Sequence, residues 1–121
     1  MKTLLKTSRK INSALEKFAT EHMGTISLTD KAMTGLSIDK IDVDSMYLFE
    51  TCDNETGDVI TQAVISDGVN CYSTCSSIVV SMVDQLIDMV NNGDANVSDI
   101  HMSFAYGNTR NGNKCLTCNI M

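Results

Sequence analysis

Apolar residues recur at helical spacing at the start of the chain. Within residues 3–23, those that would share one side of a helix are Leu4, Ile11, Leu15, Phe18 and Ala19. Most of the charged residues in this segment are Lys or Arg, and they fall at other positions. Gly24 follows at the position where a left-handed glycine commonly ends a helix. The pattern predicts an amphipathic helix over residues 3–23 with a basic outer side.

After Gly24 the apolar residues alternate with Ser, Thr or Asp, which is the period of a strand. Short strands are therefore predicted around residues 26–28, 36–38 and 41–43. Turn-forming residues separate these segments.

A longer pair of strands is predicted at residues 46–52 and 59–66. The acidic segment between them ends in Thr56 and Gly57. That ending suits a type I turn whose glycine forms a bulge. We therefore expect these two segments to form a β-hairpin.

The helical period returns over residues 72–91. One side of this helix would carry Cys75, Ile78, Val79, Met82, Val83, Leu86, Met89 and Val90. Val80 and Ile87 widen the apolar arc to roughly half of the circumference, more than contact with one sheet requires. We expect the helix to contact the sheet and a further element, either the first helix or a second copy of the chain. Together with strand 59–66, which is apolar on both faces, the wide arc predicts a homodimer.

The last two segments, 100–106 and 114–120, predict a second hairpin. A two-residue turn would place aromatic residues opposite polar ones. A type I turn with a bulge at Gly112 shifts the register by one residue. The bulged turn, which we favour, gives these opposite pairs: Tyr106 with Leu116, Phe104 with Cys118, and Met102 with Ile120.

The order helix, strands, helix, two-stranded hairpin predicts an α+β domain. We expect two layers, with two amphipathic helices on one face of a mostly antiparallel sheet. The chain has 121 residues, so residues 1–121 are expected to form a single domain. Hydrophobic residues make up 43% of the chain and charged residues 20%, a composition that excludes the signature of disorder.

Composition also predicts a cytoplasmic location. The longest apolar runs have three or four residues, far short of the roughly 20 that span a bilayer. The first residues lack the apolar region of a secretory signal. Five cysteines are an odd number and too few for a small disulfide scaffold, which favours free thiols in a reducing compartment. We expect no contact with a membrane.

Charge is segregated along the chain. Between Ile41 and Thr109 there is no Lys or Arg, yet eleven of the fifteen carboxylates fall in this stretch. The acids expected to form a partner-binding surface are Asp42, Asp44, Asp53, Glu55, Asp58, Asp84 and Asp88. Asp84 and Asp88 lie one helical turn apart with no basic residue in their helix, so an external cation or basic surface would relieve their repulsion.

This segregation favours a non-catalytic protein-interaction module, such as an inhibitor, an adaptor or a chaperone-like protein, that binds a basic partner surface. Complementary charge speeds encounter and fixes orientation. A small acidic protein of a phage or mobile element that blocks a host enzyme would fit this description. Direct binding to nucleic acid is opposed by the net charge of −6, because duplex affinity depends on neutralising phosphates.

An alternative function is a sensor that binds an anion or a nucleotide. Ser73, Thr74 and Ser76 fall at the predicted start of the second helix, where backbone N–H groups can receive a phosphate. Arg110, at a hairpin tip, would supply a cation. The segment lacks the second glycine and the lysine of a phosphate-binding loop, and helix capping by Ser or Thr is the ordinary explanation.

Two cysteine pairs, Cys71 with Cys75 and Cys115 with Cys118, have spacings seen in zinc sites. Residues three apart in a strand point to opposite faces, so Cys115 and Cys118 would not share one ion. Neither of the two histidines is expected beside a cysteine that it could activate. We therefore expect no metal, no cofactor and no catalytic residue, and we do not expect an enzyme.

Overall fold

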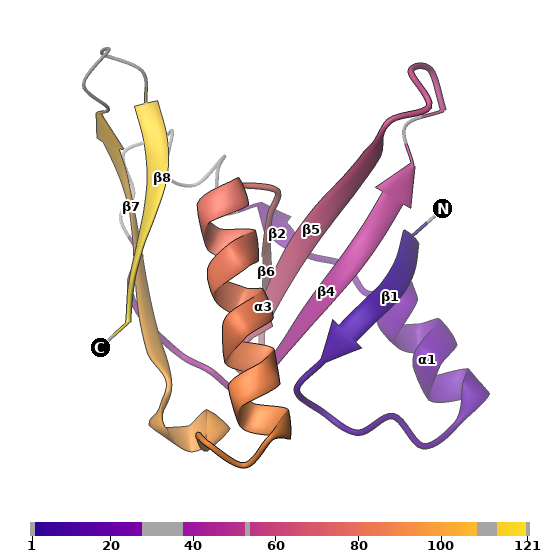
Figure 1. Cartoon of the computed structure of the whole chain (residues 1–121), viewed down its shortest axis with the longest axis horizontal. Coiled ribbons are helices and arrows are strands. Elements are labelled where there is room, and N and C mark those ends of the chain that lie inside the picture. The colour runs from indigo at the N-terminus through magenta and orange to yellow at the C-terminus, as the bar shows by residue number, and fades with distance from the viewer. Residues whose placement is uncertain (1, 28–37, 53, 109–113, 121) are drawn as a thin grey trace.

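The structure is a computed structural model that describes residues 2–27, 38–52, 54–108 and 114–120; for residues 38–40, 105–108 and 114–119 it describes the backbone alone. The described elements, in chain order, are β1 (Lys2–Thr7), α1 (Ala14–Glu21), β2 (Ile26–Ser27), β3 (Ile38–Asp42), β4 (Ser45–Cys52), β5 (Val59–Ser66), β6 (Cys71–Thr74), α3 (Ser77–Asn91), the 3-10 helix η1 (Val97–Asp99), β7 (His101–Asn108) and β8 (Lys114–Ile120). The predicted α+β class with mostly antiparallel strands is confirmed (Figure 1).

The strands form two sheets. The first has five strands in the order β1-β4-β5-β6-β2, and the second has three in the order β3-β7-β8. All neighbouring strands are antiparallel except β2 and β6. Helix α3 stands between the two sheets (Figure 1) and contacts β4 and β5 on one side and β8 on the other.

The main core surrounds α3. Its fully buried members include Met46 and Ile65 from the first sheet, Met102 from the second and Ile87 from α3. Val80 packs against the same core. Within the chain, the further contact expected for this helix is therefore with a second sheet, and not with the first helix. The wide apolar arc is explained within one chain.

A smaller apolar cluster covers the opposite face of the first sheet. Tyr47, Phe49 and Val64 are buried there, and Leu4 and Met23 pack against them. Met23 comes soon after α1, which contacts β1, and α1 lies on the side of this sheet away from α3 (Figure 1). The expectation that both helices cover one face is wrong, because β4 and β5 carry apolar residues on both of their faces.

The prediction of a helix over residues 3–23 is wrong for the first half of that segment. Residues 2–7 form β1, which pairs with β4. The helix begins only after Ser13, whose side-chain oxygen accepts a hydrogen bond from the Glu16 N–H at 3.1 Å. Helical spacing is a weak local preference, and hydrogen bonding to a neighbouring strand overrides it here.

The second helix starts later than predicted, at Ser77 instead of Tyr72. The residues before it form β6, which pairs with β5. The side chain of Ser76 makes no capping hydrogen bond, and the Ser76 N–H donates to Thr74 Oγ1 at 3.1 Å. The predicted helix thus combined the end of one sheet with the true helix.

The hairpin of β4 and β5 is confirmed. The two strands pair along their full length, ending with Cys52 opposite Val59. Gly57 has a φ of +74°, the left-handed conformation that favours glycine and that the bulged turn requires.

The hairpin of β7 and β8 has the register predicted for the bulged turn. The pairs are Met102 with Ile120, Phe104 with Cys118, and Tyr106 with Leu116. Its turn, residues 109–113, lies outside the described residues. Of the short predicted strands, residues 26 and 27 form β2, residue 38 lies in β3, and 41–43 overlap β3. Residues 28, 36 and 37 lie outside the described residues.

Candidate functional site

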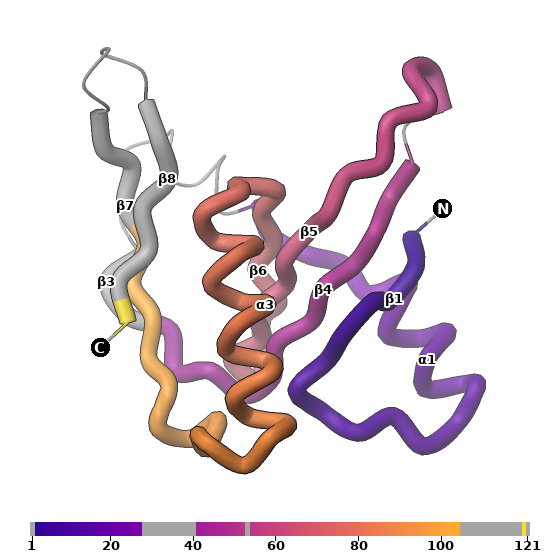
Figure 2. Tube along the Cα trace, in the orientation of Figure 1, coloured from indigo at the N-terminus to yellow at the C-terminus, as the bar shows by residue number. Residues whose placement is uncertain are grey.

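The outer half of the β4–β5 hairpin extends beyond the core. Ala63, Val64 and Ile65 in the inner half of β5 are fully buried, whereas Val59 and Ile60 near the tip are 60% and 40% exposed. The hairpin diverges from α3 toward its tip (Figure 2). Large apolar side chains are thus left uncovered where strand and helix separate.

A groove of about 480 Å³ lies between this part of β5 and the first half of α3. The residues that line it are Val59, Ile60, Thr61, Cys75, Ser77, Val80, Ser81 and Asp84. The lining combines aliphatic residues with the hydroxyl residues Thr61, Ser77 and Ser81. Among these described lining residues there is one carboxylate and no Lys or Arg. We call this site the β5–α3 groove.

Strand pairing places a further acid beside the groove. Glu50 stands opposite Thr61, and Cys52 stands opposite Val59, on the face of the hairpin that is turned toward α3. Asp58 directly precedes Val59 and is exposed. Within the described part of the chain, neither Glu50 nor Asp58 forms an ion pair with Lys or Arg. The rim of the groove is therefore negative.

Lys6 reaches the far end of the groove because β1 contains a bulge. Leu4 stands opposite Phe49 and Lys6 stands opposite Leu48, so Leu5 is an extra residue in the ladder. The bulge turns Lys6 to the face of α3, although Leu4, two residues earlier, packs on the other face. The sequence alone placed Lys6 on a helix and so missed this contact.

Lys6 lies between the two carboxylates of α3 that were expected to need an external cation. Its Nζ is 2.6 Å from Asp84 Oδ1 and 3.1 Å from Asp88 Oδ1. Hydrogen bonds to Asp84 and Asp88 raise the pKa of Lys6 above its usual value. The chain itself thus supplies a cation for this pair, and the net charge at this end of the groove is reduced.

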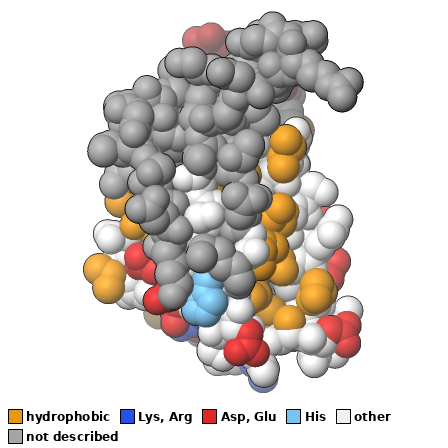
Figure 3. Space-filling view, turned by 90° about the vertical axis from the view of Figure 1, so that its left-hand side faces the viewer, with side chains coloured by type: hydrophobic (Ala, Val, Ile, Leu, Met, Phe, Trp, Pro, Cys, Tyr) orange, Lys and Arg blue, Asp and Glu red, His pale blue; other side chains and the backbone are white. Residues whose placement is uncertain are grey.

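The remaining predicted acids do not form one continuous surface with Asp84 and Asp88. Asp42 stands opposite His101, with Oδ1 2.8 Å from His101 Nδ1. Asp44 directly precedes β4 and its N–H donates to the Ser66 carbonyl at 2.7 Å. Acidic side chains are visible at the lower end of the face that carries the second sheet (Figure 3).

The acids at the hairpin tip lie at the other end of β4. Glu55 and Asp58 are exposed, and Asp53 lies outside the described residues. Since β4 has eight residues and a strand rises about 3.3 Å per residue, the tip is about 25 Å from Asp44. The predicted acidic surface is therefore divided between the two ends of the hairpin. Of the two groups, the acids at the tip are the ones that adjoin exposed apolar residues of the groove.

The residues of the alternative anion site lie elsewhere than predicted. Ser73 and Thr74 are in β6 and are 5% and 3% exposed. Ser73 Oγ accepts a hydrogen bond from Thr25 Oγ1 at 2.9 Å, and Thr74 Oγ1 accepts one from the Ser76 N–H. These two hydroxyl groups thus belong to the sheet and not to a helix start. Arg110 lies outside the described residues.

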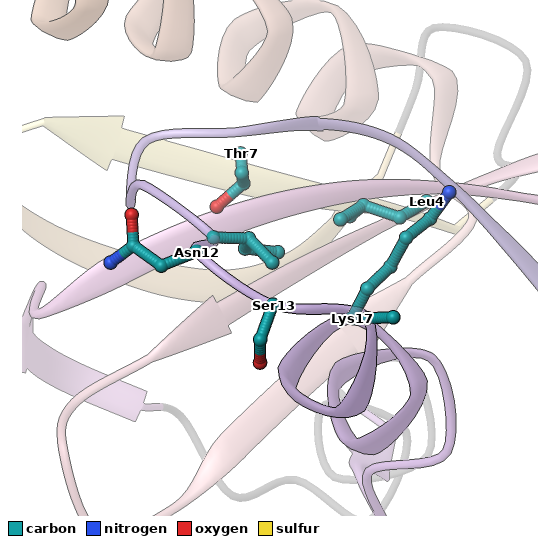
Figure 4. A pocket seen from close by; sticks show the side chains of 7 residues that line it. Leu4, Thr7, Asn12, Ser13 and Lys17 are labelled. Carbon is teal, nitrogen blue, oxygen red and sulfur yellow. The ribbon is translucent and has the colours of Figure 1, made fainter.

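A second hollow, of about 430 Å³, lies between β1 and α1 (Figure 4). The residues that line it are Leu4, Thr7, Ile11, Asn12, Ser13, Ala14 and Lys17. Figure 4 shows the Lys17 side chain extending from α1 toward Leu4. Glu21 accepts a hydrogen bond from the Leu4 N–H at 3.3 Å, so α1 covers part of the outer edge of β1. We assign this hollow to the packing of α1 on an edge strand.

Other kinds of site have less support. Cys71 and Cys75 are free thiols, and burial raises the pKa of Cys75. In the part of the chain that the structure describes, no group of three His, Cys, Asp or Glu residues is placed to hold a metal ion, and no helix has the length and apolar character needed to cross a membrane. Comparisons with known protein families, curated proteins and solved structures give no match.

Proposed function

We propose that the protein is a non-catalytic interaction module that binds a basic, apolar segment of a partner protein in the β5–α3 groove. The observation that carries this proposal is the exposure of Val59, at 60%, inside a groove whose rim is negative. An exposed apolar surface rimmed by polar residues is typical of an interaction site.

The apolar part of the groove supplies the anchor. Val59 on β5 and Val80 on α3 offer aliphatic surface that no other described element covers completely. The side chain of Ile60, the next residue along β5, points to the opposite face of the strand. Burying such surface stabilises a complex by about 25 cal/mol per Å² of apolar area. A partner segment with one or two large aliphatic side chains would therefore gain its main contact here.

The charge of the rim determines which segment is favoured. Glu50 and Asp58 flank the groove, and Asp84 lines it. Because Lys6 already contacts Asp84, the attraction comes mainly from the rim acids and from the net charge of −6. Lys or Arg beside the aliphatic anchor would speed association and fix the orientation of the partner.

A labelled amphipathic peptide of Leu and Lys tests the proposal, with a peptide of Leu and Glu as its matched control. Fluorescence anisotropy should show binding of the Leu/Lys peptide that weakens with salt, and no binding of the Leu/Glu peptide. Val59→Asp should weaken the binding at least about tenfold, which corresponds to about 1.4 kcal/mol.

Val69→Asp is the control variant, since Val69 is 89% exposed and does not line the groove. It adds the same charge at a distant place. Equal affinity of the Val59→Asp and Val69→Asp variants, or failure of the Leu/Lys peptide to bind, would contradict the proposal.

A further inference from the structure

Helix α1 presents an apolar side that the described part of the chain does not cover. Leu15 is 82% exposed and Phe18 is 61% exposed, and residues three apart share one side of a helix. Of the eight residues of α1, only Thr20 is buried. The Phe18 ring stacks on His22 at 4.2 Å between ring centroids, a local contact within the same segment. The apolar side of α1 is therefore available to another molecule.

The surroundings of this apolar side are basic. Apart from Lys6, which contacts α3, residues 2–22 contain four Lys or Arg residues and two Glu residues, while the rest of the chain is strongly acidic. Lys17 is 3.9 Å from Glu21. Arg9 is paired with Glu16 at 2.7 Å. Lys10 is exposed, and within the described residues it forms no ion pair. The N-terminal segment thus has the chemistry that the β5–α3 groove favours: large apolar side chains with basic neighbours.

We infer that α1 of a second copy of this chain occupies the β5–α3 groove, with Leu15 and Phe18 against Val59 and Val80. The inference rests on the proposed function of the groove and names one occupant of it. Opposite charges on the two surfaces orient the copies. The same contact formed reciprocally gives a dimer with two α1-to-groove contacts.

The size of α1 favours this arrangement over direct pairing of two α1 helices. An eight-residue helix is about 12 Å long. Two such helices side by side would bury far less than the roughly 1,200 Å² of a stable specific interface. Two reciprocal contacts bury the apolar sides of both α1 helices and the apolar walls of both grooves. Direct pairing would bury the two helices alone.

This dimer differs from the one that the sequence predicted. That prediction relied on Val80 and Ile87 together with strand 59–66. Ile87 is fully buried between the two sheets, whereas Val59 of the strand lines the groove. A partner protein that binds the groove would have to displace α1 of the second copy. Self-association and partner binding would thus compete for the same surface.

A complementation experiment tests the inference. Phe18→Asp removes the apolar side of α1, and Val59→Asp changes the groove. Light scattering over a range of concentrations should show a dimer for the wild-type chain and a monomer for each variant alone. An equimolar mixture of the two variants should associate again, because one α1-to-groove contact stays intact in the mixed pair.

Two controls keep the test independent of misfolding. Leu15→Asp, at a position 82% exposed, should behave like Phe18→Asp and should also be complemented by Val59→Asp. Val69→Asp should remain a dimer. Circular dichroism spectra should be the same for all variants.

The outcomes separate this inference from the proposed function. A wild-type chain that stays monomeric overturns the inference, while binding of the Leu/Lys peptide would still support the function of the groove. Monomeric variants whose mixture stays monomeric also overturn it, since that result shows that α1 of one copy does not contact the groove of the other. Complementation without binding of the Leu/Lys peptide supports the inference and contradicts the broader function.

Discussion

Lys6 occupies its position because of one extra residue in β1. Without the bulge at Leu5, Lys6 would share the face of Leu4 and point away from α3. With it, the amine lies between Asp84 and Asp88. The pair of acids one turn apart indicated from sequence that a cation was needed. Its source was not predictable, because it depends on strand register.

Replacing Lys6 with Met tests this contact. The hydrogen bonds to Asp84 and Asp88 raise the pKa of Lys6 above 10.5. The stabilisation is therefore fully present below pH 10.5 and is lost as the pH rises through the higher pKa of the folded state. Thermal unfolding should show a slightly lower Tm for Lys6→Met at neutral pH, and the difference should shrink in strongly alkaline solution.

Lys10→Met is the matched control, since it removes the same charge from the same segment without breaking a bridge to α3. It should leave the Tm nearly unchanged. A loss in Lys10→Met equal to that in Lys6→Met would show that net charge, and not the bridge, determines the effect.

At the scale of elements, the placement of α3 between two sheets explains why its apolar arc is wide. Ile87→Ala should destabilise the chain by about 2–5 kcal/mol, because it leaves a cavity at a fully buried position. The loss, measured by denaturant unfolding, should be the same at low and high protein concentration.

Ile78→Ala is the control on the same helix, since Ile78 is 50% exposed. It should change the free energy of unfolding by no more than about 0.5 kcal/mol. A loss in Ile87→Ala that appears only at concentrations where the chain self-associates would instead place Ile87 in an interface between copies.

Elements with a strict period of two were predictable from sequence. Pairing apolar residues with apolar ones across the two strands, as in Phe104 opposite Cys118, predicted the correct register of β7 and β8. The reason is that one face of a strand must be apolar if that face is buried. Gly57 likewise marked the turn between β4 and β5.

Element boundaries were less predictable where two preferences overlap. Leu4 fits a helical spacing with Ile11 as well as a strand, and pairing with β4 decides between them. Residues 72–74 were predicted as helix for the same reason, but pairing with β5 places Cys71–Thr74 in β6. Such choices depend on distant residues that a local pattern does not contain.

At the scale of the whole molecule, the acidic stretch does not form a single surface. Asp42 and Asp44 lie at one end of the first hairpin and Asp58 at the other, while Asp84 is paired with Lys6. The acids were predictable from the sequence, whereas the apolar strand beside them was expected to form a homodimer and not a partner-binding groove. The adjacent pair Val59 and Ile60, next to an acidic turn, was the available signal. That these two residues line one groove together with Cys75 and Val80 could be seen only from the fold.

The most direct test of the central claim is to map peptide binding by NMR. The Phe18→Asp variant, labelled with ¹⁵N, is titrated with the unlabelled Leu/Lys peptide, so that self-association does not affect the spectra. We predict that the largest amide shift changes fall in residues 59–61 and 75–84, on the two walls of the groove. Changes centred on Asp42 and Asp44, or spread evenly over the acidic residues, would contradict the account.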